Sequence, residues 1–322
     1  MPRALITGIN GQDGSYLAEL LLDRGYRVIG LMREGADARA QRIGHLRSQI
    51  EVVTGSLLSE DLLRKIIAEH RPDEIYNFAA RASSRQLFVD PVLTGDFNGL
   101  AVARILEAIR TVHPRTRFCQ ASSSEMFGDA RQAPQSESTP FRPRNPYGVA
   151  KLFAHGMVRT YREHFGVFAC SSILFNHESP RRGSEFVTRK ITMGVARIKR
   201  GLQTSLELGN LDAVRDWGYA ADYVDAMWKM LQAESADDYV VATGQSHSVR
   251  EFCSVAFAHV GLDYRDYVRV DPGARRAPEA VPLIGDASKA RRVLEWQPIV
   301  PFETLVRMMV DADIAALAQQ VE

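Results

Sequence analysis

The sequence predicts an α/β fold, a doubly wound parallel sheet joined to a smaller C-terminal lobe. Two observations support it: short apolar segments alternate with helical patterns through the first half, and a glycine-rich turn follows the first apolar segment. Such β-α-β alternation is typical of a parallel sheet with helices on both faces. The expected strands are 4–7, 27–31, 51–53, 74–78, 117–121 and 168–174, and the expected helices between them are 12–24, 59–70 and 100–111.

The alternation loosens beyond residue 165, where polar loops at 176–183 and 271–278 separate the elements. We expect residues 1–175, with a strand and helix returning near 215–245, to form the sheet domain. Residues 176–322 are then expected to form mainly the lobe. The remaining expected helices are 188–200, 221–232, 249–260 and 302–317, and the remaining strands are 205–208 and 239–242.

Composition excludes several classes of protein. The chain has 322 residues, 45% of them hydrophobic, and a net charge of +1, so no long-range field attracts nucleic acid or an anionic membrane. The N-terminus leads directly into a strand and no apolar run is long enough to span a bilayer. Cys119, Cys170 and Cys253 lack metal-ligand spacing and are expected to be buried, reduced thiols. We therefore expect a cytoplasmic protein that binds no metal, nucleic acid or membrane.

The turn after the first strand has the spacing GxxGxxG and opens the first helix. Glycines there allow a tight turn and let the backbone approach a pyrophosphate at the helix N-terminus. The alternative is a glycine turn with a structural role only. Its position favours a Rossmann-type site for a dinucleotide, and the residues expected to contact it are Gly8, Asn10, Gly11, Gln12, Asp13 and Gly14.

Charge at the end of the second strand bears on which dinucleotide binds. An acidic residue there accepts hydrogen bonds from the ribose hydroxyls of NAD, whereas arginine binds the 2′-phosphate of NADP. Arg33 follows the strand, and Glu34 stands next to it and would repel a phosphate on the same side. Solvated loop charges are the alternative. The sequence favours NADP, with NAD as the second choice.

Tyr147 and Lys151 lie four residues apart and therefore share one face of a predicted helix. A lysine ammonium beside a phenol stabilises the phenolate, so we expect the pKa of Tyr147 to fall toward neutrality. Lys151 can also bind the nicotinamide ribose. This spacing arises by chance on amphipathic helices, but the preceding Asn-Pro and glycine turn favour a site for alcohol oxidation.

Ser123 and Glu125 follow the strand at 117–121. The carboxyl ends of parallel strands are where ligands bind, so Ser123 is expected to share a proton with Tyr147 and a substrate hydroxyl. Hydride transfer alone needs no carboxylate there, whereas elimination of water needs a base and an acid. Glu125 thus indicates elimination, with a helix-capping or salt-bridging carboxylate as the alternative.

These residues resemble the extended short-chain dehydrogenase/reductase family and, within it, the GDP-mannose 4,6-dehydratases. The resemblance covers nearly the whole chain, and its most specific segments are GINGQDGSYL (8–17), QASSSEMFG (120–128), NPYGVAKL (145–152), LFNHESPRRGSEFVTR (174–189), LGNLDAVRDWGYAADY (208–223) and HSVREF (247–252). It implies conversion of GDP-mannose to GDP-4-keto-6-deoxymannose. C4 is oxidised transiently with Tyr147 as base, Glu125 assists loss of water across C5 and C6, and hydride returns to C6.

The resemblance also implies ligand contacts and an assembly. A homodimer or homotetramer is implied, with helices 100–111 and 149–165 at one interface and the loop 33–47 at a second. Further cofactor contacts are implied at Ser56, Leu57, Ala79 and Ala80. Contacts with the GDP-sugar are implied at Ser84, Asn176, Glu178, Val187, Lys190, Gly209, Arg215, Arg276 and Glu279.

The chain departs from the family pattern at several positions. Ser123 replaces a threonine, Arg81 a glutamine, Ser56 an aspartate and Glu34 an arginine. A dehydratase acting on a related GDP-sugar such as a heptose, or a nucleotide-sugar epimerase or 4-keto reductase, is therefore an alternative. An epimerase can use the same tyrosine and lysine without Glu125. A non-catalytic binding protein on the same fold is a further alternative, which the presence of Tyr147 and Lys151 disfavours.

Overall fold

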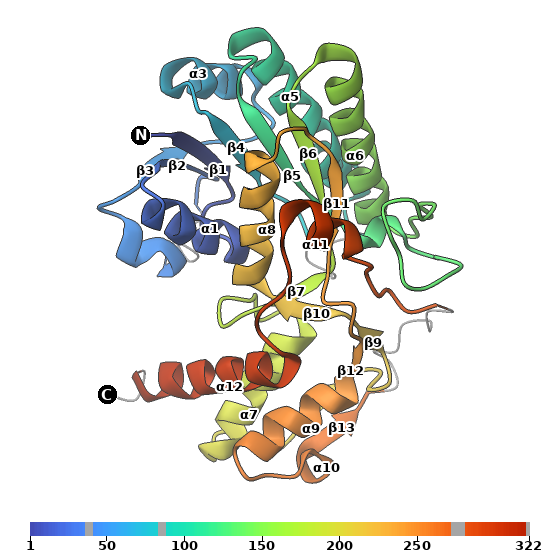
Figure 1. The fold of residues 1–322 in the computed structure, drawn as a ribbon. Helices are drawn as coiled ribbons and strands as arrows, with labels where there is room; N and C mark the ends of the chain where they lie inside the picture. The colour runs from blue at the N-terminus through green and yellow to red at the C-terminus, as the bar shows by residue number, and fades with distance from the viewer. Residues whose placement is uncertain (36–40, 83–87, 272–280, 320–322) are drawn as a thin grey trace.

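A seven-stranded parallel sheet forms the centre of the larger part of the protein (Figure 1). The computed structural model describes residues 1–35, 41–82, 88–271 and 281–319. The strand order is β11-β6-β5-β4-β1-β2-β3. The strands are β1 (Arg3–Thr7), β2 (Arg27–Met32), β3 (Glu51–Thr54), β4 (Glu74–Asn77), β5 (Arg117–Ser123), β6 (Ala169–Leu174) and β11 (Asp238–Val241). The predicted doubly wound parallel sheet is confirmed.

Helices cover both faces of the sheet, as its apolar strands require. Side chains such as Ile6 and Tyr76 face α1 (Gln12–Asp23), α8 (Ala220–Gln232) and α11 (Ser288–Leu294). Their neighbours Leu5 and Ile75 pack on the opposite face. That face is covered by α3 (Glu60–His70), α5 (Ala101–Val112) and α6 (Pro146–Phe165).

The helix expected to begin at residue 100 begins earlier. Pro91 starts α4 (Pro91–Gly95), and the Asp90 side chain accepts a hydrogen bond from the Leu93 amide at 2.9 Å. The π-helix η2 (Asp96–Leu100) then joins α4 to α5. Pro91 fits a first helical position because its missing amide hydrogen would have no partner there. Two short 3₁₀ helices, η1 (Gln41–Leu46) and η3 (Ser124–Met126), follow β2 and β5.

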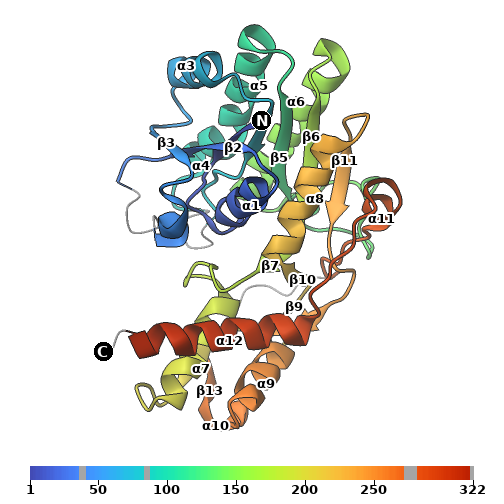
Figure 2. The same cartoon turned by 60° about the vertical axis from the view of Figure 1, so that its left-hand side comes forward.

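The smaller lobe lies beyond the carboxyl ends of the strands (Figures 1 and 2). It has its own core, in which Trp217, Phe252 and Phe302 pack together. Its helices are α7 (Val187–Lys199), α9 (Val249–His259), α10 (Tyr264–Tyr267) and α12 (Phe302–Gln319). Its short strands pair as β8 (Leu206–Leu208) with β13 (Val268–Val270), β9 (Val214–Arg215) with β12 (His247–Ser248), and β7 (Asn176–Glu178) with β10 (Trp217–Tyr219).

The segment 176–183, expected to be a loop, begins instead with strand β7. Its polar residues form a strand because they pair with β10, which is distant in sequence. A buried carboxylate, Asp216, holds this region to the sheet domain. It accepts hydrogen bonds from Thr243, Gly244 and Gly285, which follow β11 or precede α11. Within the described part of the chain, no helix is long and apolar enough to cross a membrane.

Candidate active site

The glycine turn lies between β1 and α1 and packs against the segment after β4. Gly8 has a φ of 69°, and its amide donates to the Leu31 carbonyl at 3.0 Å. A Cβ on Gly8 would lie 2.9 Å from the Ala79 nitrogen, so only glycine fits. Gly11 precedes α1 without a side-chain cap. The first-turn amides of α1 therefore suit a phosphate, as the sequence predicts for Asn10 to Gly14.

Two side chains in the first turn of α1 join the cofactor turn to the lobe. Gln12 donates to the His177 carbonyl at 3.1 Å and accepts from the Ser179 hydroxyl at 2.8 Å. Asp13 accepts from Gln12 at 2.9 Å, and its other oxygen lies 3.1 Å from Nε2 of His177. These contacts fix β7 against α1. The sequence predicted Gln12 and Asp13 at the cofactor site but missed His177.

The environment of the Asp13–His177 pair favours its ionic form. Burial alone would neutralise both groups, but their mutual attraction and hydrogen bond lower the pKa of Asp13 and raise that of His177. His177 Nδ1 also lies 2.7 Å from the Phe175 carbonyl, which can only accept. Both ring nitrogens therefore donate, as in an imidazolium.

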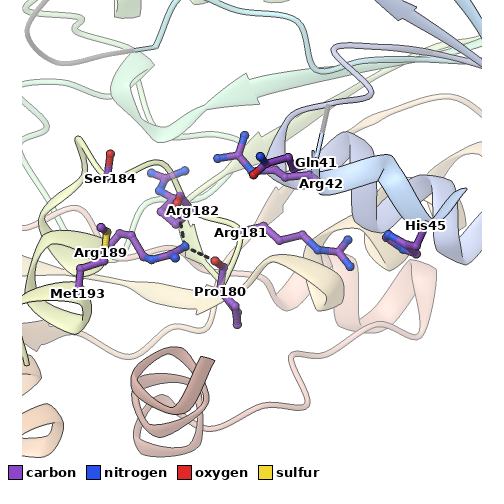
Figure 3. A pocket seen from close by; sticks show the side chains of 9 residues that line it. All are labelled: Gln41, Arg42, His45, Pro180, Arg181, Arg182, Ser184, Arg189 and Met193. Carbon is purple, nitrogen blue, oxygen red and sulfur yellow. Dashed lines mark hydrogen bonds between the residues drawn. The ribbon is translucent and has the colours of Figure 1, made fainter. Parts of the chain in front are cut away.

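Four arginines surround a pocket of about 500 Å³ beside the glycine turn (Figure 3). Figure 3 shows that they come from η1, from the loop after β7 and from α7. The pocket is lined by Gln41, Arg42, His45, Pro180, Arg181, Arg182, Ser184, Arg189 and Met193. Such a rim favours an anionic ligand, because guanidinium groups match phosphate oxygens in pairs.

The four arginines differ in the protein groups to which they are already bonded. Arg42 donates to the Asn10 carbonyl at 3.3 Å and so reaches the glycine turn. Arg181 binds Glu19 of α1, and Arg182 lies 3.0 Å from Glu178. Arg189 binds the buried carboxylate of Asp313 in α12 and the carbonyls that the dashed lines in Figure 3 mark. Sequence reasoning did not select Arg182, although it lies in a quoted segment.

The other predicted cofactor residues lie at the carboxyl ends of neighbouring strands. Arg33 is exposed just after β2. Beyond β3, the Ser56 hydroxyl accepts from the Leu58 amide at 3.2 Å, and Leu57 is buried. Beyond β4, Ala79 contacts the glycine turn and Ala80 is exposed. The parallel sheet thus brings these residues to the one edge where the sequence predicts a dinucleotide.

Ser123, Glu125 and Tyr147 come together where β5 meets α6. The Ser123 and Tyr147 side chains are hydrogen-bonded, and the Ser123 hydroxyl also accepts from the Glu125 amide at 3.2 Å. A Cβ on Gly148 would lie 2.5 Å from the Glu125 carbonyl oxygen. This close approach places the first turn of α6, with Tyr147, directly against Glu125. The expected grouping of a phenol, a hydroxyl and a carboxylate is therefore present.

Tyr147 differs from expectation in its acidity. Burial raises the pKa of Tyr147 to about 12, although its hydrogen bond to Ser123 lowers it. Lys151 is also buried, which lowers its pKa to about 8, and its ammonium donates to the Ala121 carbonyl at 2.6 Å. The ammonium lies 5.6 Å from the centre of the Tyr147 ring. The expected fall in the pKa of Tyr147 toward neutrality is thus wrong for the protein alone, because desolvation outweighs the hydrogen bond from Ser123 and the charge of Arg182, which lower that pKa.

Asn145 is a site residue that sequence reasoning missed. Its Oδ1 accepts from the Gly148 amide at 2.8 Å and caps α6, and its Nδ2 donates to Glu125 Oε2 at 2.7 Å. One amide thus sets the start of the tyrosine-bearing helix and the orientation of the carboxylate. The Asn-Pro before the helix signalled the cap. The hydrogen bond from Asn145 to Glu125, twenty positions earlier, had no local signal in the sequence.

The predicted substrate residues are spread over the lobe. Asn176 begins β7, just beyond β6, and the Glu178 side chain is buried and accepts from Thr188 at 2.5 Å. Ser84, Arg276 and Glu279 lie outside the described residues. The remaining ones are Val187 and Lys190, both exposed in the first turn of α7, Gly209 after β8, and Arg215 in β9.

The ionic Asp13–His177 pair predicts a pH-dependent stability. The raised pKa of His177 contributes stability that is complete below its unfolded value of 6.5 and is lost as pH rises through the folded value. The lowered pKa of Asp13 contributes stability that is lost only as pH falls below 3.8. His177→Gln should therefore reduce the free energy of unfolding by about 1–3 kcal/mol at about pH 5.5. The loss should be smaller at about pH 8.5.

Thermal unfolding of the cofactor-free protein at several pH values measures this difference. His259→Gln is the matched control, because His259 pairs with Asp311 on the surface, where Asp311 is 64% exposed. Solvent screens that pair, so the control should change little. An effect of His177→Gln that is constant across the pH range would show that the pair is not ionic.

Comparison with known proteins identifies the family to which the chain belongs. The family model described as "GDP-mannose 4,6 dehydratase" matches residues 5–309. GDP-mannose 4,6 dehydratase 1 of Arabidopsis thaliana is 49% identical, over 97% of this chain and 89% of that protein.

Two solved structures show the same fold. One is a dTDP-glucose 4,6-dehydratase from Bacillus anthracis in complex with NAD, with a TM-score of 0.85 and 20% identity over 97% of this chain and 96% of that one. The other is RMD from Pseudomonas aeruginosa complexed with NADPH, with a TM-score of 0.82 and 23% identity over 98% of this chain and 100% of that one. From its sequence match over nearly its whole length, the chain belongs to the GDP-mannose 4,6-dehydratase family.

Proposed function

We propose that the protein converts GDP-mannose to GDP-4-keto-6-deoxymannose. The observation that carries this proposal is the placement of Glu125. It lies against Tyr147, close enough for its charge to act on the phenol, and Asn145 holds its carboxylate at 2.7 Å. A site that only transfers hydride needs no such carboxylate, whereas elimination of water needs an acid and a base on one substrate.

Three side chains divide the proposed chemistry. Tyr147, bonded to Ser123, takes the proton of the C4 hydroxyl. A bound nicotinamide would supply the acceptor for the C4 hydride and the source of the hydride for C6. The 4-keto group makes the C5 proton acidic. Glu125 removes that proton and delivers a proton to the departing C6 hydroxyl, so one water leaves. Tyr147, which still holds the proton taken from the C4 hydroxyl, is then the source of the proton that C5 regains, directly or through Glu125.

The high pKa of Tyr147 sets a requirement on this chemistry. A phenol with a pKa of about 12 is almost entirely protonated at neutral pH and so cannot accept the proton of the C4 hydroxyl. The oxidised nicotinamide carries a positive charge, which would lower that pKa when bound beside the ring. Lys151 would bind the nicotinamide ribose. The phenol would thus become an effective base only when cofactor and substrate are both in place.

Glu125→Gln tests the elimination step. The amide can neither remove the C5 proton nor protonate the leaving hydroxyl, so turnover of GDP-mannose should fall about a hundredfold or more. The assay follows the 4-keto product by its absorbance in alkali and by the loss of one water in its mass. Glu163→Gln, at the exposed far end of α6, is the control and should keep full activity.

A second variant separates an effect on the position of Glu125 from an effect on folding. Asn145→Asp keeps an oxygen to cap α6 but replaces the donor to Glu125 with a like charge, so activity should fall while the melting temperature holds. Full turnover by Glu125→Gln would instead favour an epimerase or 4-keto reductase. Turnover of a GDP-heptose but not of GDP-mannose would favour the related dehydratase.

We infer that the cofactor is NADP. Arg33 lies exposed after β2, and Arg42 approaches the Asn10 carbonyl from η1, so positive charge borders the site of the adenosine ribose.

The proposed cofactor domain comprises residues 1–175 with the strand and helix that return near 215–245, and residues 176–322 mainly bind the GDP-sugar. Because the three cysteines are buried and free, we place the enzyme in the cytoplasm.

Arg33→Ala tests the choice of cofactor. It should weaken NADPH binding about tenfold and leave NADH binding unchanged, because only NADPH carries the 2′-phosphate. Titration of the cofactor-free protein measures both affinities. The control is Arg27→Ala, which removes an exposed arginine at the opposite end of β2. Equal losses for both cofactors would contradict a 2′-phosphate contact.

We propose a homodimer, or a homotetramer built from it, in which the helices of residues 91–112 and 146–165 pack against those of a second copy. An apolar groove of about 680 Å³ runs between α4, η2 and α6. Val92, Leu100, Val149 and Phe153 line it, with exposed fractions from 44% to 79%. An apolar surface of this kind on two adjacent helices suits a self-complementary interface.

Phe153→Glu should lower the mass in solution toward that of one 35.9 kDa chain, as measured by light scattering. A buried charge at the centre of an interface is strongly unfavourable, which is the reason for the expected dissociation. Ile299→Glu changes an equally apolar but remote exposed residue and should leave the mass unchanged. A wild-type protein that is already a single chain would contradict the proposed assembly.

A further inference from the structure

A row of buried polar side chains crosses three strands under the active site. Thr7 of β1 pairs in register with Asn77 of β4, which pairs with Gln120 of β5. All three are at most 1% exposed. Two positions earlier in the same strands, the side chains on this face are apolar. Buried polar groups are costly unless they are hydrogen-bonded, so the partners of this row indicate what it does.

The row forms one continuous chain of hydrogen bonds. The Thr7 hydroxyl donates to Asn77 Oδ1 at 2.5 Å, and Asn77 Nδ2 donates to Gln120 Oε1 at 2.7 Å. Gln120 Nε2 then donates to the Ala121 carbonyl at 2.9 Å. At the other end, the Ala79 amide donates to the Thr7 hydroxyl at 3.2 Å.

Backbone groups fix the direction of the chain at both ends. The Ala121 carbonyl can only accept, so Gln120 must turn its nitrogen toward it and its oxygen toward Asn77. The Ala79 amide can only donate, so the Thr7 hydroxyl must give its own proton to Asn77. Neither amide can flip without placing two donors or two acceptors face to face. The donor and acceptor orientation of every side chain in the row is therefore fixed, from the edge of the glycine turn to Ala121.

The Ala121 carbonyl also accepts from Lys151 at 2.6 Å. A carbonyl oxygen has two lone pairs, and Gln120 and Lys151 take one each. We propose that Gln120 is a positioning residue for Lys151: it occupies one side of the Ala121 carbonyl and so confines the ammonium to the side that faces the Tyr147 ring. This inference rests on the role proposed above for Lys151.

Loss of Gln120 should displace the ammonium. Lys151 is 2% exposed, so it stays close to this carbonyl. With the amide removed, one lone pair of the Ala121 carbonyl oxygen would have no donor. The Lys151 ammonium would then shift to a position between the two lone pairs. Displacements of about 1 Å in a catalytic group cost up to about a hundredfold in rate. The effect should therefore appear in kcat, with KM little changed.

Two buried glutamines allow a matched test by turnover. Gln120→Met removes the donor to Ala121 and should lower kcat about ten- to a hundredfold, with KM within about twofold of wild type. The control is Gln135→Met. Gln135 is equally buried and its side chain is also hydrogen-bonded, to Gln132, Pro282 and Ile284, in a separate loop. Both variants should lose stability, but only Gln120→Met should lose kcat. Equal kcat values in the two variants would overturn the proposal.

Gln120→Glu gives a readout that a purely structural role would not produce. A protonated carboxyl donates to Ala121 and accepts from Asn77, as the amide does, whereas an ionised one attracts the ammonium away from the ring. The charged groups that act on Tyr147 or Lys151, namely Asp13, Glu125 and Arg182, are unchanged in this variant. The ratio of its kcat to that of wild type should fall about tenfold between about pH 5.5 and about pH 8.5. A constant ratio would contradict the proposal.

A titration separates this inference from the proposed function. Carbon-13 NMR of labelled lysine should show a higher pKa for Lys151 in Gln120→Glu than in wild type, and no change in Gln135→Glu. This readout needs no turnover. If wild type fails on every GDP-hexose but the Lys151 pKa rises, the proposed function fails and the positioning holds. If wild type is active but the pKa is the same in both variants, the positioning fails and the function stands.

Discussion

The contact between the first turn of α1 and strand β7 is the constraint on which the rest of the site depends. Gln12 and Asp13 come from the cofactor turn, whereas His177 and Ser179 lead into the lobe. The same few side chains therefore set the position of the lobe relative to the glycine turn. Because Asp13 and His177 are both charged and largely enclosed, separating them would leave two unpaired charges. The two ligand-binding parts are thereby held in one arrangement.

A common feature of the site is that each reactive group is held by a residue that also has a structural role. Asn145 caps α6 and orients Glu125. Ala121 is part of β5 and accepts from Lys151, and Ser123 ends β5 and bonds Tyr147. The reacting side chains thus have little rotational freedom before substrate binds. Such preorganisation reduces the entropy that the reaction must otherwise overcome.

The fold could be predicted from sequence because its signals are local. Strands such as Arg27–Met32 are apolar where both faces are buried, and the glycine turn has a spacing tied to its backbone geometry. Strand β7 could not be predicted, because Asn176 and its polar neighbours form a strand only through β10. The expected pKa of Tyr147 was wrong for a related reason: a four-residue spacing shows that a lysine is near, but it does not show how strongly the surrounding protein desolvates the phenol. The bond from Asn145 to Glu125 likewise depends on packing between separate elements.

The departure from the family pattern at Arg81 can be understood from its backbone. The Asn98 side chain, 1% exposed in the π-helix η2, accepts from the Arg81 amide at 2.9 Å and donates to its carbonyl at 3.0 Å. Both main-chain groups of residue 81 are thus held by another residue, whatever side chain it carries. Replacing a glutamine by arginine there leaves the path of the chain beyond β4 unchanged, and with it the contact of Ala79 with Gly8. The substitution therefore adds a positive charge near the carboxyl end of the sheet without disturbing the cofactor turn, so any effect on substrate choice must come from the guanidinium itself.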